Sequence, residues 1–197
     1  MTAMDMKTQK TMHFMVICTI IFSIFFMVSC KKQEQIKEIM VMDDTDNLLV
    51  YARLQDSLKE EMIKLVRVGA PIHCVFYVNF YKEKPYRDIR LSQRVVKNVL
   101  KYDNVKKNTY VTTLLNGQEI EMAEFQDIDS AQLFMFEISS IPIITTHSLD
   151  KQEKYYVAIK AKIGREQSSL LTRYAMIFLP FIGEQTSWHR KAFIWKN

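Results

Sequence analysis

The sequence predicts a mainly β fold: an antiparallel, β-rich α+β domain of sandwich-like architecture, preceded by an apolar N-terminal helix. Consecutive β-favouring runs are joined by turn signals, and short amphipathic helical segments interrupt them. The regular strand–helix alternation of a parallel βαβ sheet is absent. Aromatic residues make up 12% of the 197-residue chain and glycines number only 4, which argues for a packed core and against disorder. We therefore expect one domain with two or three short helices.

The N-terminal region is almost wholly apolar over residues 12–29, with His13, Thr19 and Ser23 as the interruptions. About 18 such residues are marginally enough to cross a bilayer core of roughly 30 Å. They are slightly long for a signal peptide, whose apolar stretch is about 7–15 residues. The segment ends in Met-Val-Ser-Cys at 27–30, which resembles the bacterial lipobox. In that motif the cysteine, here Cys30, is lipidated and becomes the new N-terminus.

Three fates of this segment stay open: a cleaved lipoprotein with lipid on Cys30, an uncleaved transmembrane anchor, and a free secreted protein. All three export the bulk of the chain. We expect residues 1–30 to be a signal peptide or membrane anchor, 31–35 a tether, and 36–197 a single β-rich domain in the periplasm.

The first elements of the domain are a hairpin and a helix. Residues 36–42 and 48–54 are β-favouring runs on either side of an Asp/Asn turn, which predicts a hairpin. A helix follows, which Asp56 is expected to cap, Gly69 to close and Pro71 to stop. Its apolar face comprises Leu58, Met62, Leu65 and Val66.

The middle of the chain favours strands. Residues 72–81 are rich in β-branched and aromatic side chains, and 88–103 form a second candidate strand. Asn116-Gly117 lies between two β runs within 109–125 and is the strongest hairpin signal of the chain.

A second helix and a further strand are expected next. Residues 127–140 favour a helix in which Asp129 and Gln132 are spaced like a capping box. Its expected apolar face is Ala131, Phe134, Met135 and Ile138. Residues 154–163 alternate as a strand with one buried face.

The stretch 168–181 has apolar residues at helical spacing. They are Leu170, Leu171, Tyr174, Ile177, Phe178 and Phe181. A helix of about 14 residues is about 21 Å long, too short to span a bilayer. Two interpretations stay open: the stripe packs on the sheet as core, or Phe178 and Phe181 contact a membrane surface or a membrane partner.

Residues 187–195 favour a closing strand that carries both tryptophans. Trp188 and Trp195 are seven residues apart, so on a strand without a bulge their side chains face opposite sides of the sheet. One is expected to pack inside and the other to lie at a rim. Because tryptophan is enriched in binding hot spots, contact with a partner or ligand is the alternative to core packing or edge protection.

Several of these stretches occur together in a particular order: the early hairpin, LVRVGAPIHCVFYV, KYDNVKKNTYVTTLLNG, KYYVAIKAKI, the Leu/Phe-rich segment that ends at Pro180, and SWHRKAFIW. The combination resembles the DUF 4390 family (domain of unknown function), small exported bacterial proteins with an N-terminal apolar segment. The resemblance covers about residues 35–197. It implies one exported domain, and it supplies no catalytic residues. Because genes of family members often lie beside a membrane sensor kinase of the nitrogen-regulation type, it also implies a signalling or envelope role.

The charge balance limits the class of partner. The chain has 27 Lys+Arg and 22 Asp+Glu, a net charge of +5. On an exported protein this mild excess favours anionic lipid headgroups over nucleic acid, and no signature of a nucleic-acid-binding fold is present. With cysteines only at 18, 30 and 74, no disulfide framework is expected, and Cys74 is expected to be a small buried hydrophobe.

No metal or cofactor site is expected. His73 and Cys74 are adjacent in a strand, so their side chains point to opposite faces, and zinc-ligand spacings are absent. The acidic turn that contains Asp43, Asp44 and Asp46 lacks the glycine and the distal Glu of a calcium loop. With glycines only at 69, 117, 164 and 183, no phosphate-binding glycine loop is possible.

No catalytic residues are expected either. His147, Ser148 and Asp150 are close in sequence, but no Gly-x-Ser-x-Gly elbow accompanies them, and a solvated loop after Pro142 is favoured. We therefore expect a non-enzymatic binding or regulatory module of the envelope. The alternatives are a carrier of a lipid or other apolar ligand, and an enzyme whose site is assembled from residues distant in sequence.

Overall fold

The computed structural model describes residues 35–55, 58–165 and 185–196 of the chain. These belong to one compact unit, Glu34–Asn197. The predicted N-terminal apolar helix, the predicted cap Asp56 and the apolar stretch at 168–181 lie outside the described residues. Within the described ranges, no helix combines the length and the apolar character that crossing a membrane requires.

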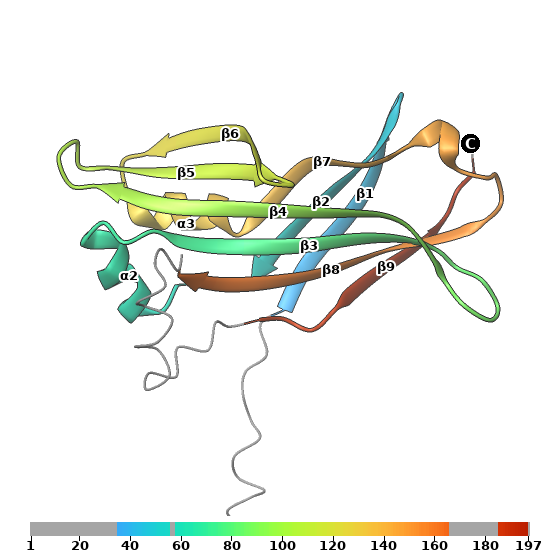
Figure 1. The fold of residues 1–197 in the computed structure, drawn as a ribbon, viewed down its shortest axis with the longest axis horizontal. Coiled ribbons are helices and arrows are strands. Elements are labelled where there is room, and N and C mark those ends of the chain that lie inside the picture. Colours follow the sequence, from blue (N-terminus) through green and yellow to red (C-terminus); the bar gives the residue numbers. More distant parts are fainter. Residues whose placement is uncertain (1–34, 56–57, 166–184, 197) are drawn as a thin grey trace, which may run out of the picture. The chain divides into compact units, whose positions relative to one another are not determined.

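Nine described strands form two antiparallel sheets (Figure 1). The smaller sheet has the order β1-β2-β7, with β1 (Gln35–Asp44), β2 (Asn47–Gln55) and β7 (Glu137–Thr145). The larger sheet has the order β6-β5-β4-β3-β8-β9, with β3 (Ile72–Lys82), β4 (Ile89–Asp103), β5 (Asn108–Leu115), β6 (Gln118–Phe125), β8 (Lys154–Arg165) and β9 (His189–Ile194). Every strand pair is antiparallel, which confirms the predicted β-rich fold class.

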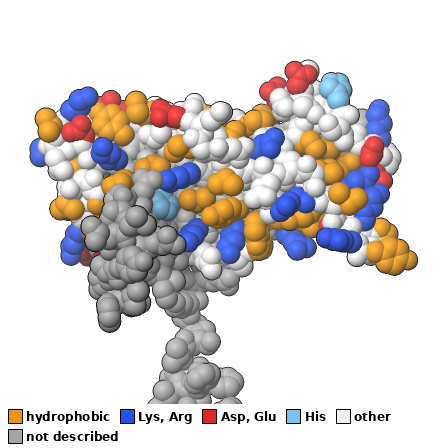
Figure 2. Space-filling model, viewed as in Figure 1, with side chains coloured by type: hydrophobic (Ala, Val, Ile, Leu, Met, Phe, Trp, Pro, Cys, Tyr) orange, Lys and Arg blue, Asp and Glu red, His pale blue; other side chains and the backbone are white. Residues whose placement is uncertain are grey.

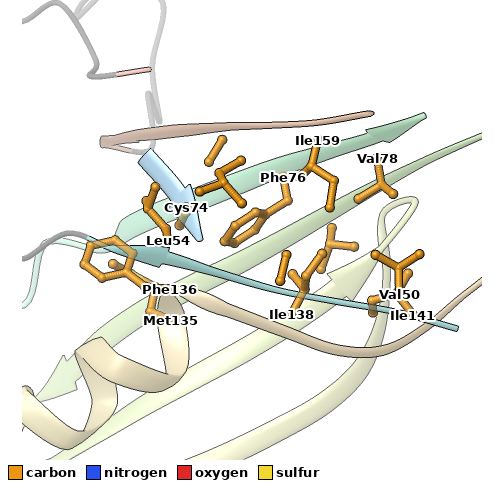
Figure 3. Close-up of a cluster of buried hydrophobic side chains, with 14 of the residues drawn as sticks. Val50, Leu54, Cys74, Phe76, Val78, Met135, Phe136, Ile138, Ile141 and Ile159 are labelled. Atoms are coloured by element: carbon orange, nitrogen blue, oxygen red, sulfur yellow. The ribbon is translucent and has the colours of Figure 1, made fainter. Parts of the chain in front are cut away.

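A hydrophobic core lies between the two sheets. Phe76 of β3 is fully buried, and Figure 3 shows it together with Ile138 of β7 and Ile159 of β8. The helices α2 (Glu60–Arg67) and α3 (Ile128–Met135) contribute Val66 and Met135 to the same core. Each such large side chain contributes roughly 1.5–3 kcal/mol when it is fully buried. The core therefore holds both sheets and both helices in one domain.

The predicted hairpin at Asn116-Gly117 is confirmed. Both residues have positive φ, 50° and 89°, as the tight primed turn between two strands requires. The Asn116 side chain also accepts a hydrogen bond from the backbone N–H of Val95 at 3.0 Å. This contact joins the β5–β6 turn to β4.

The predicted first helix is confirmed as α2, with a shifted start. Its N-cap is Lys59, which makes no capping hydrogen bond through its side chain. Gly69 has a φ of 87° and closes the helix as expected, and the N–H of Ala70 donates to the carbonyl of Leu65 at 3.0 Å. Of the predicted apolar face, Leu58, Met62 and Val66 are buried and Leu65 is half-buried.

The predicted second helix is wrong in its cap and in its length. Asp127 is the N-cap, and its carboxylate accepts the N–H of Ser130 at 2.7 Å. Gln132 instead accepts the N–H of Leu58 through its side-chain oxygen at 3.0 Å, so no capping box with Asp129 forms. The helix ends at Met135 because the chain turns there into β7.

The strand β7 replaces the predicted end of that helix and the start of the loop expected after Pro142. Ile138 and Ile141 of β7 face the core beside β2, and their burial outweighs local helical preference. Ser140 has a φ of 54° within an irregular stretch of the ladder, which interrupts strict alternation. Pro142 is tolerated because β7 is an edge strand.

Side chains of β4 hold the free edge of β7. Arg94 donates through Nε to the carbonyl of Pro142 at 3.1 Å, and the Ser92 hydroxyl donates to the carbonyl of Ile143. The Asn98 amide donates to the carbonyl of Glu137 at 2.8 Å. An edge strand would leave these backbone carbonyls of β7 without hydrogen-bond donors. Side chains from β4, in the other sheet, supply the donors.

Candidate functional site

The outward side of the six-stranded sheet is turned away from the core. In β3, Phe76 and Val78 point into the core, so Val75, Tyr77 and Asn79 point outwards. We call the outward positions of β3, β4, β8 and β9 the basic face. Its basic side chains are Arg90, Lys97, Lys101, Lys154, Lys160, Lys162 and Arg190.

The strand register spreads these charges in two dimensions. Val75 pairs with Lys97 on β4 and with Lys162 on β8, so the two lysines lie about two strand widths apart, roughly 10 Å. Tyr77, two residues further along β3, pairs with Lys160 on β8. Lys160 and Lys162 are about 7 Å apart along their strand. The basic face is thus a grid of cations with tyrosine and valine between them.

Acidic side chains are scarce on this face. Across the described strands β3, β4, β8 and β9, the acid at an outward position is Asp103, the last residue of β4. Its carboxylate accepts the N–H groups of Val105 and Lys106, and these bonds lower the pKa of Asp103. Among the described residues, neither Lys160 nor Lys162 has an ion-pair partner.

The space-filling view agrees with this distribution. In Figure 1 the six-stranded sheet lies in front of β1 and β2, so Figure 2, with the same viewpoint, shows its outward side. Lys and Arg side chains occur across the middle of this side and at both of its ends, while Asp and Glu lie mainly along its upper rim.

A cluster of tyrosine and arginine lies at one end of the basic face. The rings of Tyr81 and Tyr156 stack at 4.9 Å, and the Arg190 guanidinium lies 5.1 Å from the Tyr156 ring centroid. The Tyr156 hydroxyl donates to Asp88 at 2.8 Å, and the N–H of Lys84 donates to the same carboxylate at 3.2 Å. These two bonds lower the pKa of Asp88, whereas burial, with Asp88 nearby, raises the pKa of Tyr156 to about 12.

A network of ion pairs ties the base of the β3–β4 hairpin to the loop before β8. The Lys82 ammonium contacts the carboxylates of Asp150 and Glu153, the latter at 3.1 Å, and its side chain is only 13% exposed. Lys84 reaches Glu153 at 2.9 Å. The hydrogen bond to Asp150 is the main cause that raises the pKa of Lys82, while Lys84 and Lys82 lower the pKa of Glu153. Because these charges pair with one another, the network is suited to holding the hairpin in place.

The sequence-predicted interaction residues fall into two groups. Cys30, Phe178 and Phe181 lie outside the described residues. Trp188 is 46% exposed just before β9, while Trp195 is partly buried against the core just after it. The two tryptophans thus flank β9 and have different surroundings.

The residues that were weighed as metal or catalytic candidates do not come together. Cys74 is buried in the core, whereas the neighbouring His73 points outwards from β3. Ser148 shares a hydrogen bond with Thr145 at 2.8 Å, and Asp150 contacts Lys82, so neither faces His147 as in a triad. In the described part of the chain, no three His, Cys, Asp or Glu side chains are grouped as a metal site would require.

Sequence reasoning missed the basic face as a unit. One signal for it was present: Lys160 and Lys162 alternate with the inward-facing Ile159, Ala161 and Ile163 of β8. The sequence did not indicate that charges on β4 and β9 share a surface with Lys160 and Lys162, because the register of these strands depends on pairings between distant parts of the chain.

The fold and this surface define a class of protein: a small two-sheet antiparallel β domain with an excess of positive charge on one sheet surface. The sequence model of DUF4390, described as a domain of unknown function, matches residues 31–191, and the chain belongs to this family. The resemblance found in the sequence is thereby confirmed. No curated protein and no solved structure matches the chain in the corresponding comparisons.

Proposed function

We propose that the protein is a membrane-anchored envelope protein whose domain acts as a non-enzymatic binding or regulatory module on the periplasmic side. The observation that carries this proposal is the basic face. It presents Lys97, Lys160, Lys162 and Arg190 on one surface, where a partner with negative charge meets several cations at once.

Two other observations favour binding at the surface. Side chains of both sheets, among them Val50, Phe76 and Ile138, fill the space between the sheets, which favours a surface partner over an apolar ligand carried inside. The charges that do converge, at Lys82, Asp150 and Glu153, are paired with one another, which favours a structural role for them over acid–base catalysis.

The anchor is proposed from the sequence alone. A lipid on Cys30, or an uncleaved apolar helix that ends there, would keep the domain beside the membrane. Substitution Cys30→Ala should abolish acyl labelling and leave the precursor unprocessed. If the wild-type chain is never processed, the anchor is a spanning helix, and if the chain is released from membranes by salt, the anchored form of the proposal is wrong.

The binding role is tested by placing a photo-crosslinking amino acid at position 162 of the full-length protein in the bacterial envelope. We expect specific adducts with an envelope component from this position. The matched control is position 106, an exposed lysine on the β4–β5 turn beyond the end of the strands that form the basic face, from which such adducts should be absent. Equal patterns from both positions would contradict a binding role of the basic face.

If the adducts contain a protein, the first candidate we propose is the membrane sensor kinase that the family resemblance implies. A binding role would then be regulatory, because the domain would report to, or modulate, the sensor across the periplasmic side of the membrane. Adducts with another envelope protein would leave the binding role in place and replace this partner.

A further inference from the structure

We propose that the partner of the basic face is an anionic phospholipid surface, on which the domain lies by electrostatic attraction. This inference rests on the proposed binding role of the same surface and adds the chemical class of what it binds. Four features of the face support it: the layout of its charges, its aromatic residues, the lack of large exposed apolar side chains at its centre, and the acidic edge beside it.

The layout of the cations matches a surface better than a strand of polymer. Lys97 and Lys162 lie on either side of β3, and Lys160 and Arg190 continue the array along β8 and across to β9. A linear polyanion is normally followed by a basic groove with stacking platforms along one track. Cations on three strands, β4, β8 and β9, with β3 lying between β4 and β8, instead contact an array of headgroups at the same time.

The aromatic residues of the face suit the interface between water and lipid. Tyr77 and Tyr81 are half-buried at outward positions of β3, with basic residues on the adjacent strands. Tyrosine is enriched at the headgroup level of membranes because its ring is apolar and its hydroxyl is polar. Tyr156 completes the row through its stacking on Tyr81.

The centre of the face lacks the residues that would insert into the bilayer. The outward apolar positions of β3 and β4, Val75, Val95 and Val99, are only half-exposed. Large exposed apolar side chains of the sheet occur at its margins instead, for example Met122 on β6 and Ile194 at the end of β9. The attraction is therefore expected to come mainly from charge and to weaken strongly with salt.

The acidic edge strand defines where the contact ends. β6 carries Glu119, Glu121 and Glu124, all exposed, at the edge of the sheet far from β9. Negative charge at that edge is repelled by anionic headgroups, so the contact centres on β3, β8 and β9. A protein anchored by its N-terminal segment needs only weak affinity at this face, because the anchor supplies a high effective concentration.

The test uses residues 31–197, which contain the whole described core and lack the proposed anchor. Co-sedimentation with vesicles that contain phosphatidylglycerol is compared with neutral phosphatidylcholine vesicles, at low and at high salt. We expect binding to the anionic vesicles at low salt, little binding to the neutral ones, and loss of binding at high salt.

The double substitution Lys160→Gln with Lys162→Gln should weaken this binding about 30-fold, since each lysine near an anionic surface contributes about a factor of five. The matched control, Lys106→Gln with Lys107→Gln, makes the same change of charge on the β4–β5 turn and should leave binding nearly unchanged. Melting temperatures check that the variants are folded. If the double variant fails to fold, Arg90→Gln, at an exposed outward position, should weaken binding about five-fold.

Binding that persists in the double variant or at high salt would overturn the inference, because attachment would then come from another part of the chain. Absence of vesicle binding, together with crosslinks from position 162 to a protein, would overturn the lipid partner and leave the binding role intact. Absence of both would remove the inference and the binding role together.

Discussion

Tyr156 and Asp88 show how a single hydroxyl sets the pKa of a carboxyl group at one end of the basic face. The hydrogen bond from Tyr156 is the main cause of the lowered pKa of Asp88. The charge of the nearby Arg190 also lowers the pKa of Asp88. The ring that carries this hydroxyl stacks on Tyr81 and lies beside the Arg190 guanidinium.

Substitution Tyr156→Phe should therefore raise the pKa of Asp88 toward its ordinary value, as followed by NMR titration of the carboxyl carbon. A carboxyl group whose pKa is lowered by folding stabilises the fold above its unfolded pKa, and this stabilisation is lost as pH falls through the folded pKa. The variant should therefore lose less stability on acidification than the wild type. Tyr110→Phe, at a half-buried position on β5, is the control. An unchanged titration of Asp88 would contradict the assignment of the hydroxyl as the main cause.

At the scale of elements, Asn98 joins β4 to the junction between α3 and β7. Its side chain is buried, and its amide donates to the carbonyls of Met135 and Glu137 at 2.9 and 2.8 Å. One side-chain amide thus supplies hydrogen bonds to the last carbonyl of the helix and to the first carbonyl of β7, the strand that the sequence did not predict. This contact acts together with the pairing of β7 with β2 and the bonds from Ser92 and Arg94 to position β7.

Substitution Asn98→Ala should reduce the free energy of unfolding by roughly 2–4 kcal/mol, because it leaves two buried carbonyls without a donor. Chemical denaturation measures this change. Asn98→Asp should be at least as destabilising, since a carboxylate places an acceptor where the carbonyls need a donor. Gln93→Ala, exposed in the same strand, is the control and should be nearly neutral. Equal effects at positions 93 and 98 would contradict the bridging role.

For the whole molecule, stability is expected to reside in the core between the sheets. Phe76 is fully buried on the central strand β3, where side chains of β2, β7 and β8 join the same core. Phe76→Ala should therefore cost about 3–5 kcal/mol in the free energy of unfolding, measured by denaturation with urea. Tyr86→Ala, at a fully exposed position in the β3–β4 turn, should leave stability nearly unchanged. A small effect at position 76 would contradict a single cooperative core.

Local signals in the sequence were sufficient for many elements. The Asn116-Gly117 turn was predictable because only a few residue types adopt two successive positive φ angles, and the structure has this conformation. Gly69 was predictable as the end of α2 for the same reason. The long β-branched and aromatic runs gave β3 and most of β4 within a residue or two of their bounds.

The strand conformation of β7 and the composition of the basic face were decided by the tertiary structure alone. β7 escaped prediction because an irregular stretch around Ser140 breaks its alternation and an apolar helical pattern precedes it. Its strand conformation comes from pairing with β2 across more than eighty residues of sequence, a distance over which local propensity carries no information.

The basic face depends on long-range pairing in the same way. Lys97, Lys162 and Arg190 come from three strands, and for β8, which carries Lys162, the outward alternation was visible in the sequence. Their meeting on one side requires the order β4-β3-β8-β9 and the register of each pair. The sequence by itself thus determined the main strands and the tight turns, because these follow from local conformational preference, and the order of its segments carried the resemblance to the family. Only the tertiary structure decided which charges share a surface, because a shift of one residue in register would turn them to the opposite face.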